Sequence, residues 1–263
     1  MRIPNFLTDE GSILYKNTVG KQISPRVGDI VIEKLGKVIC SDTHEVLDVA
    51  CGPGTISLNL ARKYPDIHIT GIDASRAMIE QCHQVVEQEG LKNTSFMTMN
   101  ANAIQFPSSS FDCVVCNLAF PFFSKPQESV KGIHDALKPG GTLLISVPGR
   151  NTWKEFFSIA EELTGGMPTF ARPFLSKFDK AESLPAAMEA AGFIDLEITA
   201  NPIPFHFERA SEVLNFFQEL FSLLNYVPDE IKTDVAEIID SRFPNGFTMH
   251  YEAIIVQAKR PLS

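Results

Sequence analysis

The stretch that decides the fold is Glu45-Val46-Leu47-Asp48-Val49-Ala50-Cys51-Gly52-Pro53-Gly54-Thr55. The apolar residues up to Val49 are typical of a buried strand, and Thr55 opens a segment with helical spacing. Between them, Gly52 and Gly54 can adopt backbone angles that are closed to other residues. A strand, a glycine turn and a helix together present unpaired backbone N–H groups and the positive end of a helix dipole. The stretch therefore predicts a binding site for a small charged cofactor.

A second strand follows and ends in an acidic residue. Residues 67–73 predict this strand, and a helix begins after Ser75, a residue type that caps helices. Asp73 lies about 20 residues after the glycines, at the position where α/β sheets bind the ribose hydroxyls of a nucleotide. The alternative role for Asp73 is to cap the next helix, but Ser75 already suits that position. We therefore assign Asp73 to a ribose.

The composition is that of an ordinary soluble globular chain. Its 263 residues are 44% hydrophobic and 21% charged, enough for one large α/β domain or a core domain with an insert. The net charge of −9 argues against nucleic-acid binding, which rests on clustered Lys and Arg. Residues 1–5 lack an apolar signal-peptide core, and no apolar run approaches the ~18 residues of a membrane span. We expect a cytoplasmic protein without a membrane span.

Five cysteines are an odd and sparse set, which favours a reducing compartment over a disulfide framework. Cys113 and Cys116 form a C-x-x-C pair inside residues 111–116, which predict a buried strand. No second pair of ligands occurs at metal-like spacing, so we favour core packing over zinc or redox chemistry. No metal site is predicted.

Four blocks of sequence, in order and spacing, resemble the class I S-adenosylmethionine (SAM)-dependent methyltransferases of small molecules. The blocks are residues 45–55, 71–75, 100–112 and 137–145. The resemblance implies a doubly wound α/β fold with a seven-stranded, mostly parallel sheet. It also implies that the last strand runs antiparallel beside the sixth, and that the cofactor is S-adenosyl-L-methionine.

The resemblance also implies contacts for individual residues. Asp48 would lie near the methionine amino group of SAM, Asp73 would hold the ribose, and Ala74 and Met78 would lie beside the adenine. Asn100 stands where the family usually has Asp, and its carbonyl oxygen can still accept from the adenine amino group. The predicted cofactor-binding residues are Tyr15, Asp48, Ala50, Gly52, Gly54, Asp73, Ala74, Met78, Asn100, Ala101, Asn117 and Leu118.

Two of these contacts have open alternatives. Asn117 ends the fourth predicted strand beside the transferable methyl group, or it is only a turn residue. Tyr15, with Lys21, closes over the cofactor from the N-terminal segment, or both are merely exposed. A dinucleotide site is disfavoured because the loop lacks a third glycine, residue 57 being Ser, and no Gly-rich phosphate loop ending in Gly-Lys occurs.

The predicted organisation has a lead-in, a core and an inserted lid. An amphipathic helix is predicted over residues 23–38, after a polar, flexible segment over residues 15–21. The sixth strand is predicted over residues 193–198. The divisions are 1–44 for the helical lead-in, 45–148 for the SAM-binding core, 149–180 and 201–247 for lid and substrate segments, and 181–200 and 248–263 for the rest of the sheet.

The second half of the chain is rich in aromatic residues. Of the 20 phenylalanines, 14 lie between Phe120 and Phe221, and most of them are expected to pack inserted helices onto the core. A few would line a pocket at the carboxyl edge of the sheet. The predicted substrate contacts are Phe120, Trp153, Phe174 and Phe205, and the predicted substrate is a largely apolar or aromatic small molecule, such as a quinone, polyketide, lipid or prenylated compound.

The sequence thus predicts SAM-dependent methyl transfer. His206 and His250 are candidate general bases, with a structural role as the alternative for each. Two other functions stay open: a methyltransferase fold that binds SAM but catalyses cyclisation or elimination, and a non-catalytic partner protein. The methylated atom and the formation of a homodimer are also left open.

Overall fold

A central sheet organises the computed structural model, which describes residues 8–166, 178, 180–220 and 223–263. The strand order is β3-β2-β1-β4-β5-β7-β6. The strands are β1 (Glu45–Val49), β2 (His68–Asp73), β3 (Thr94–Thr98), β4 (Phe111–Asn117), β5 (Leu137–Pro148), β6 (Ile194–Phe207) and β7 (Phe247–Lys259). The first five pair in parallel, whereas β7 pairs antiparallel with both β5 and β6. The predicted fold class is confirmed.

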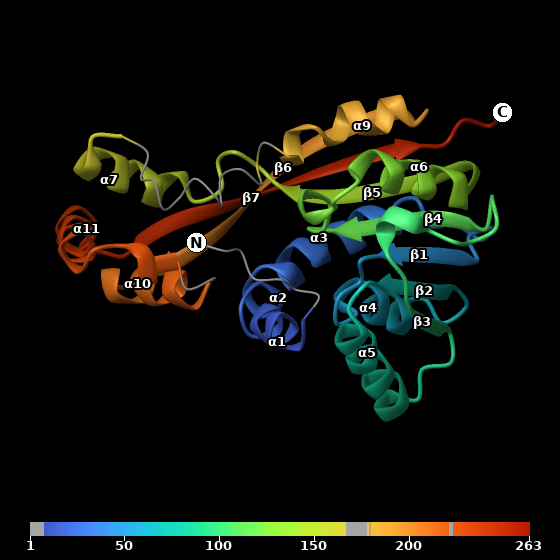
Figure 1. Ribbon diagram of the computed structural model, residues 1–263, viewed down its shortest axis with the longest axis horizontal. Helices are drawn as coiled ribbons and strands as arrows, with labels where there is room; N and C mark the ends of the chain where they lie inside the picture. Colours follow the sequence, from blue (N-terminus) through green and yellow to red (C-terminus); the bar gives the residue numbers. More distant parts are fainter. Residues whose placement is uncertain (1–7, 167–177, 179, 221–222) are drawn as a thin grey trace.

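Helices cover both faces of the sheet (Figure 1). They are α1 (Asp9–Asn17), α2 (Val19–Gln22), α3 (Ser24–Gly36), α4 (Thr55–Lys63), α5 (Arg76–Glu89), α6 (Pro126–Ala136), α7 (Lys154–Thr164), α9 (Leu184–Ala190), α10 (Ala210–Glu219) and α11 (Asp229–Arg242). Three short 3₁₀ helices are η1 (Ala101–Ala103), η2 (Phe120–Phe122) and η3 (Leu223–Tyr226).

Alternation along β1 divides the core between the two faces. Val46 packs in one buried cluster with apolar residues of α3 and α4, whereas Leu47 packs in another with residues of α6 and α9. Successive side chains of a strand point to opposite faces, so a strand covered on both faces is apolar throughout. Cys113 and Cys116 of β4 are buried in these same clusters, as expected for core residues.

The last two strands form a ribbon that extends beyond the rest of the sheet. β6 and β7 pair from Ile194 with Lys259 to Phe207 with Phe247, whereas β5 pairs with β7 only as far as Pro148 with Ala253. Helices α7, α10 and α11 gather around the far end of the ribbon (Figure 1).

The predicted sixth strand was too short, because residues 199–207 continue it. Pro202 and Pro204 suggest a strand end, yet proline is tolerated in an edge strand, where one side of the backbone has no ladder partner. Residues 201–207, expected in the lid, therefore belong to the sheet.

The N-terminal lead-in is helical over its described length. Residues 15–21, expected as a polar, flexible segment, lie mostly in α1 and α2. The Thr8 side chain caps α1 by accepting from the Gly11 N–H at 3.1 Å. The predicted helix over residues 23–38 is confirmed as α3 with slightly narrower bounds. Within the described ranges, no helix has the length and apolar character needed to cross a membrane.

Candidate cofactor site

Two neighbouring central strands end in strained backbone. Ala50, directly after β1, has φ 55°, and Leu118, directly after β4, has φ 58°. This left-handed region is unfavourable for residues with a Cβ, and it persists only where the surroundings hold it in place. Gly52 and Gly54 follow in the same loop with φ 55° and 86°. The carboxyl edge of β1 and β4 therefore carries the features of a ligand site.

The Asp73 carboxylate connects the glycine loop to the start of α5. Its Oδ2 accepts from the Gly52 N–H at 2.9 Å, and its Oδ1 accepts from the Ser75 N–H at 2.8 Å. Each carboxylate oxygen has a further lone pair, so two ribose hydroxyls can still donate to it.

The prediction that Ser75 caps α5 was wrong in its mechanism. Ser75 occupies the cap position, but its side chain makes no capping hydrogen bond, and its hydroxyl oxygen is buried with no partner in the part of the chain that the structure describes. Asp73 accepts from the backbone at this helix start instead. The alternative role considered for Asp73 is therefore real, and it coexists with a position suited to the ribose.

Asp48 is a buried carboxylate with one unused oxygen. Its side chain is 1% exposed; Oδ2 accepts from the Ser57 Oγ–H at 2.6 Å and from the Ser57 N–H at 3.2 Å. Among the described residues, Oδ1 has no hydrogen-bond partner. Burial raises the pKa of Asp48 to about 7, although the hydrogen bonds from Ser57 oppose this shift. An unpaired buried acceptor is costly, so this oxygen suits a ligand that brings a cationic N–H donor.

Tyr15 covers the glycine loop from α1. A Cβ added at Gly52 would lie 3.8 Å from Tyr15 Cε1, with no other atom within 4 Å. Burial raises the pKa of Tyr15, a hydrogen bond with Ser24 lowers it, and the Asp73 and Asp48 carboxylates raise it further. The structure therefore brings Tyr15 and Asp73, two of the predicted cofactor contacts, close to Gly52.

Asn117 links the end of β4 to the N-terminal lead-in through hydrogen bonds. Its Nδ2 donates to the Ser24 carbonyl at 3.3 Å and to Ser24 Oγ at 3.2 Å. Its Oδ1 accepts from the Ser146 hydroxyl at 2.5 Å. The amide is thus held in one orientation at the edge of the site, and a contact of Asn117 with the cofactor stays a prediction.

The predicted adenine side is built from η1 and the start of α5. Asn100 Oδ1 accepts from the Asn102 N–H at 2.9 Å and from Asn102 Nδ2 at 2.8 Å, so it caps η1. Ala101 and Met78 are buried, and Ala74 is half-buried directly after β2. The Asn100 oxygen already accepts two hydrogen bonds, so its contact with an adenine amino group also stays a prediction.

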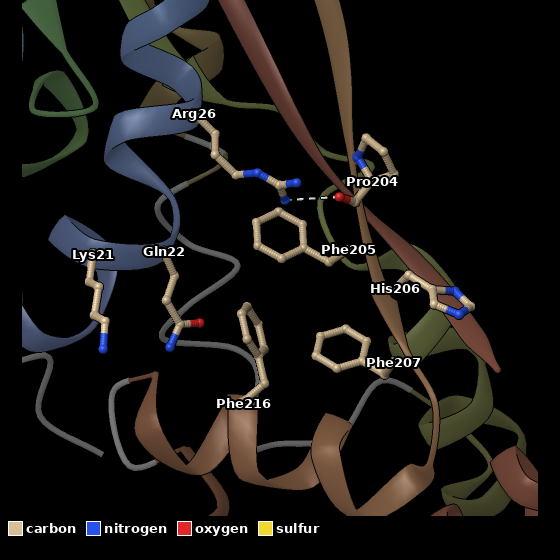
Figure 2. A pocket seen from close by; sticks show the side chains of 8 residues that line it. All are labelled: Lys21, Gln22, Arg26, Pro204, Phe205, His206, Phe207 and Phe216. Carbon is tan, nitrogen blue, oxygen red and sulfur yellow. Dashed lines mark hydrogen bonds between the residues drawn. The ribbon is translucent and has the colours of Figure 1, made fainter.

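A cleft of about 490 Å³ lies between the lead-in and the ribbon. Figure 2 shows its lining, which comes from α2, α3, β6 and α10. The lining residues are Lys21, Gln22, Arg26, Pro204, Phe205, His206, Phe207 and Phe216. Of the predicted substrate contacts, Phe205 lies here.

The other predicted substrate contacts lie elsewhere. Trp153 is fully buried and packs edge-on against the rings of Phe205 at 5.0 Å, Phe216 at 5.2 Å and Tyr251 at 5.5 Å. Phe120 is 1% exposed and belongs to the core. Phe174 is outside the described residues. Trp153 and Phe120 therefore support the site from within the core.

The two candidate bases lie on the opposite face of the ribbon from Phe205. His206 lines the cleft and shares a hydrogen bond with Thr248 Oγ1 at 2.9 Å, and its ring lies on the other side of the strand from the rings of Phe205 and Phe207 (Figure 2). His250 Nδ1 lies 2.9 Å from Glu155 Oε1, and the Glu155 Oε2 atom accepts from the His250 N–H. Because paired residues share a face and successive residues alternate, neither imidazole is on the face of Phe205. Both histidines have structural partners here.

Sequence reasoning missed Tyr251. This tyrosine of β7 is 5% exposed, contacts Trp153, and lies on the ribbon face opposite to His250. Burial raises the pKa of Tyr251 far above its ordinary value, and nearby Tyr15 raises it further. The alternation of buried and half-buried residues along β7 indicates that Tyr251 is buried. Local sequence could not relate Tyr251 to Tyr15, which lies more than 200 positions away.

Replacing Gly54 by Ala is expected to destabilise the protein by ~2 to 4 kcal/mol. A Cβ at Gly54 would lie 2.8 Å from Leu58 Cδ1 and 3.2 Å from Cys82 Sγ, at φ 86°. Gly90→Ala is the matched control, since Gly90 also has a positive φ of 67° but nothing within 4 Å of its added Cβ. We expect Gly90→Ala to lower the free energy of unfolding by ~1 kcal/mol. Urea unfolding of both variants measures the difference, and equal losses would contradict the packing argument.

Together, these features define a class of protein. A doubly wound sheet with a glycine loop after β1, an acidic residue ending β2 and strained backbone after β4 is an α/β protein that binds a nucleotide-type cofactor at its carboxyl edge.

Comparison with known proteins narrows the class to a family. Residues 46–141 match the family model described as a methyltransferase domain. The chain therefore carries a methyltransferase domain over these residues, in agreement with its resemblance to the class I SAM-dependent methyltransferases and with S-adenosyl-L-methionine as its cofactor. The predicted family and its cofactor are confirmed.

Curated relatives and a solved structure agree with this assignment. The malonyl-[acyl-carrier protein] O-methyltransferase of Brevibacillus brevis is 28% identical over 69% of this chain and 64% of its own length. The demethylmenaquinone methyltransferase of Listeria welshimeri is 30% identical over 51% and 57%, respectively. The structure of Haemonchus contortus phosphoethanolamine N-methyltransferase 2 with phosphomonomethylethanolamine and S-adenosylhomocysteine is 18% identical, with a TM-score of 0.64, over 99% of this chain and 60% of that one.

These similarities concern part of each relative. The chain spans about half to just under two thirds of the length of the curated relatives it matches. At 18% identity the solved structure supports the fold. The activities in the names of these relatives are therefore those of the relatives, and the comparisons do not assign them to this chain.

Proposed function

We propose that this chain transfers a methyl group from SAM to a largely apolar or aromatic small molecule. The observation that carries the proposal is the buried Asp48 carboxylate, whose unpaired oxygen lies beside a glycine loop held by Asp73. SAM carries an ammonium group and two ribose hydroxyls, which match these two carboxylates in charge and in hydrogen-bond donors. The two carboxylates therefore fit the charge and the hydrogen-bond donors of the cofactor.

Each residue of the site has a distinct part in this proposal. Asp48 binds the ammonium group, Asp73 orients the ribose, and the loop at Gly52 and Gly54 lets the backbone approach the cofactor. Tyr15 excludes water from above the loop, where it already lies close to Gly52. When bound, SAM supplies a methyl group already activated for in-line attack, so alignment and exclusion of water provide much of the rate.

The acceptor side of the proposal rests on the aromatic cleft. Phe205, Phe207 and Phe216 offer an apolar surface for a small molecule. Because His206 and His250 lie on the other face of the ribbon, we propose that neither acts as the base. An amine or carboxylate nucleophile needs no base, in contrast to a hydroxyl or an acidic C–H.

We further propose that the protein works in the cytoplasm. Its cysteines support this proposal, because all five are free thiols in the structure and four are buried.

The test is product analysis with methyl-labelled SAM and a panel of quinols, aromatic acids and lipids. We expect label in an organic product and one equivalent of S-adenosylhomocysteine for each methyl group transferred. A converted acceptor with SAM unchanged would contradict methyl transfer and indicate a SAM-binding enzyme of another reaction. The Gly90→Ala variant is a control for a change remote from the site, since Gly90 lies at the far end of α5 from the glycine loop. It should form the same product as the unaltered protein.

A further inference from the structure

Two cationic side chains face the aromatic cleft. Lys21 comes from α2 and Arg26 from α3, and both are exposed. The Arg26 guanidinium carbon lies 4.4 Å from the centre of the Phe205 ring, and Arg26 Nη1 donates to the Pro204 carbonyl at 2.9 Å. Among the described residues, neither cation takes part in a salt bridge. Their charges are therefore available to a ligand.

Next to these cations, the lining of the cleft includes three aromatic rings that lie close together. The rings of Phe205 and Phe207 lie 5.5 and 5.4 Å from the ring of Phe216, and Figure 2 shows these rings beside the Arg26 and Gln22 side chains. Phe205 and Phe216 also pack directly on Trp153, whose buried Nε1–H has no acceptor among the residues described. Trp153 in turn packs edge-on against Tyr251 of β7. The N-terminal lead-in connects the cleft to the cofactor loop, because Tyr15 lies close both to Gly20, the neighbour of Lys21, and to Gly52.

The charge of the cleft matches one negative group. The whole chain has a net charge of −9, so its surface in general repels anions. On the side of Lys21 and Arg26, the Glu219 carboxylate accepts from the lining residue Gln22 at 3.1 Å, whereas Glu208 lies 3.8 Å from His206, which is on the other face of β6 from Phe205. One positive charge is left over, which suits a carboxylate better than a doubly charged phosphate. Beside apolar rings, this attraction is stronger than on an open surface.

We propose that the acceptor is an amphipathic carboxylate, whose apolar body packs on Phe205, Phe207 and Phe216 and whose carboxylate binds Lys21 and Arg26. This inference deepens the proposed function and rests on it for the identification of the ligand as the acceptor. Recognition of the anion is a property of the cleft itself and can be measured without SAM.

The experiment is isothermal titration of the SAM-free protein with octanoate, octyl phosphate and octan-1-ol. We expect octanoate to bind at least ~10-fold more tightly than octanol, and to change the emission of Trp153, the sole tryptophan. Lys21→Glu should weaken octanoate binding ~10-fold or more while octanol binding changes less than ~2-fold. Lys92→Glu, the same charge reversal at an exposed residue after α5, is the matched control and should leave both affinities unchanged.

Three results would overturn the proposal. They are equal affinities for octanol and octanoate, octanoate binding that Lys21→Glu leaves unchanged, and tighter binding of octyl phosphate than of octanoate. A parallel titration of the unaltered protein with SAM tests the proposed function separately from the inference about the acceptor. Octanoate binding without SAM binding overturns the proposed function, whereas SAM binding without octanoate preference overturns only the inference about the acceptor.

Discussion

Asp73→Ala is expected to weaken SAM binding ~100-fold or more. The variant loses the acceptor for two ribose hydroxyls, and hydrogen bonds to a charged group contribute ~1.5 to 3 kcal/mol each. It also releases the Gly52 N–H, which Asp73 Oδ2 holds at 2.9 Å, so the loop loses its fixed position. Isothermal titration with SAM measures the effect. An affinity equal to that of the unaltered protein would remove Asp73 from the ribose.

Asp112→Ala is the matched control for this prediction. Asp112 Oδ2 accepts from the His44 and Glu45 N–H groups at 2.9 Å each, so it too is a carboxylate that holds two backbone donors. It lies at the amino end of β4, at the opposite edge of the sheet from the site. Its loss should lower stability without changing the affinity for SAM. A similar loss of SAM affinity in both variants would show that general destabilisation is responsible.

The second large effect concerns the pH dependence of SAM binding. The Asp48 pKa of about 7 means that the free site is mostly protonated at pH 5.5 and mostly ionised at pH 8. Because the ammonium group of SAM requires the ionised carboxylate, affinity should rise about 30-fold between these values. Asp48→Asn should bind SAM weakly and without this pH dependence. Isothermal titrations with SAM between pH 5.5 and pH 8 test this prediction. If the unaltered protein binds SAM with the same affinity at both pH values, the role of Asp48 is contradicted.

The same carboxylate should influence stability in the opposite sense. A pKa raised in the folded state stabilises the fold below the unfolded value near 3.8, and this contribution is lost as pH rises through about 7. The shift corresponds to a contribution on the order of 4 kcal/mol. Asp48→Asn removes the cost of the buried charge, so at pH 8 it should be the more stable protein without SAM. Urea unfolding at pH 5.5 and 8 checks this, and a less stable variant at pH 8 would contradict the argument.

Local sequence patterns were sufficient for the cofactor half of the molecule. The strand before Gly52, the acidic residue ending β2 and the strand around Cys113 are continuous in sequence, so their periodicity and end residues identify them. The resemblance to a known family supplied what periodicity lacks, namely the antiparallel position of β7 between β5 and β6.

Apart from Phe205, the lining of the proposed acceptor cleft could not be predicted, because it is assembled from distant segments. Arg26 donates to the carbonyl of Pro204, which lies 178 positions away, and no local pattern announces such a contact. The face that the two histidines occupy could not be predicted for a related reason, since it depends on how far β6 and β7 pair. The ribbon extends to Phe207 and Phe247, and this register sets His206 and His250 on the face away from Phe205.

The most direct test of the cofactor site is isothermal titration of the unaltered protein with SAM at pH 8. The site built around Asp48, Gly52 and Asp73 predicts saturable binding at one site per chain, with a dissociation constant in the micromolar range. Absence of measurable binding at millimolar SAM would contradict it.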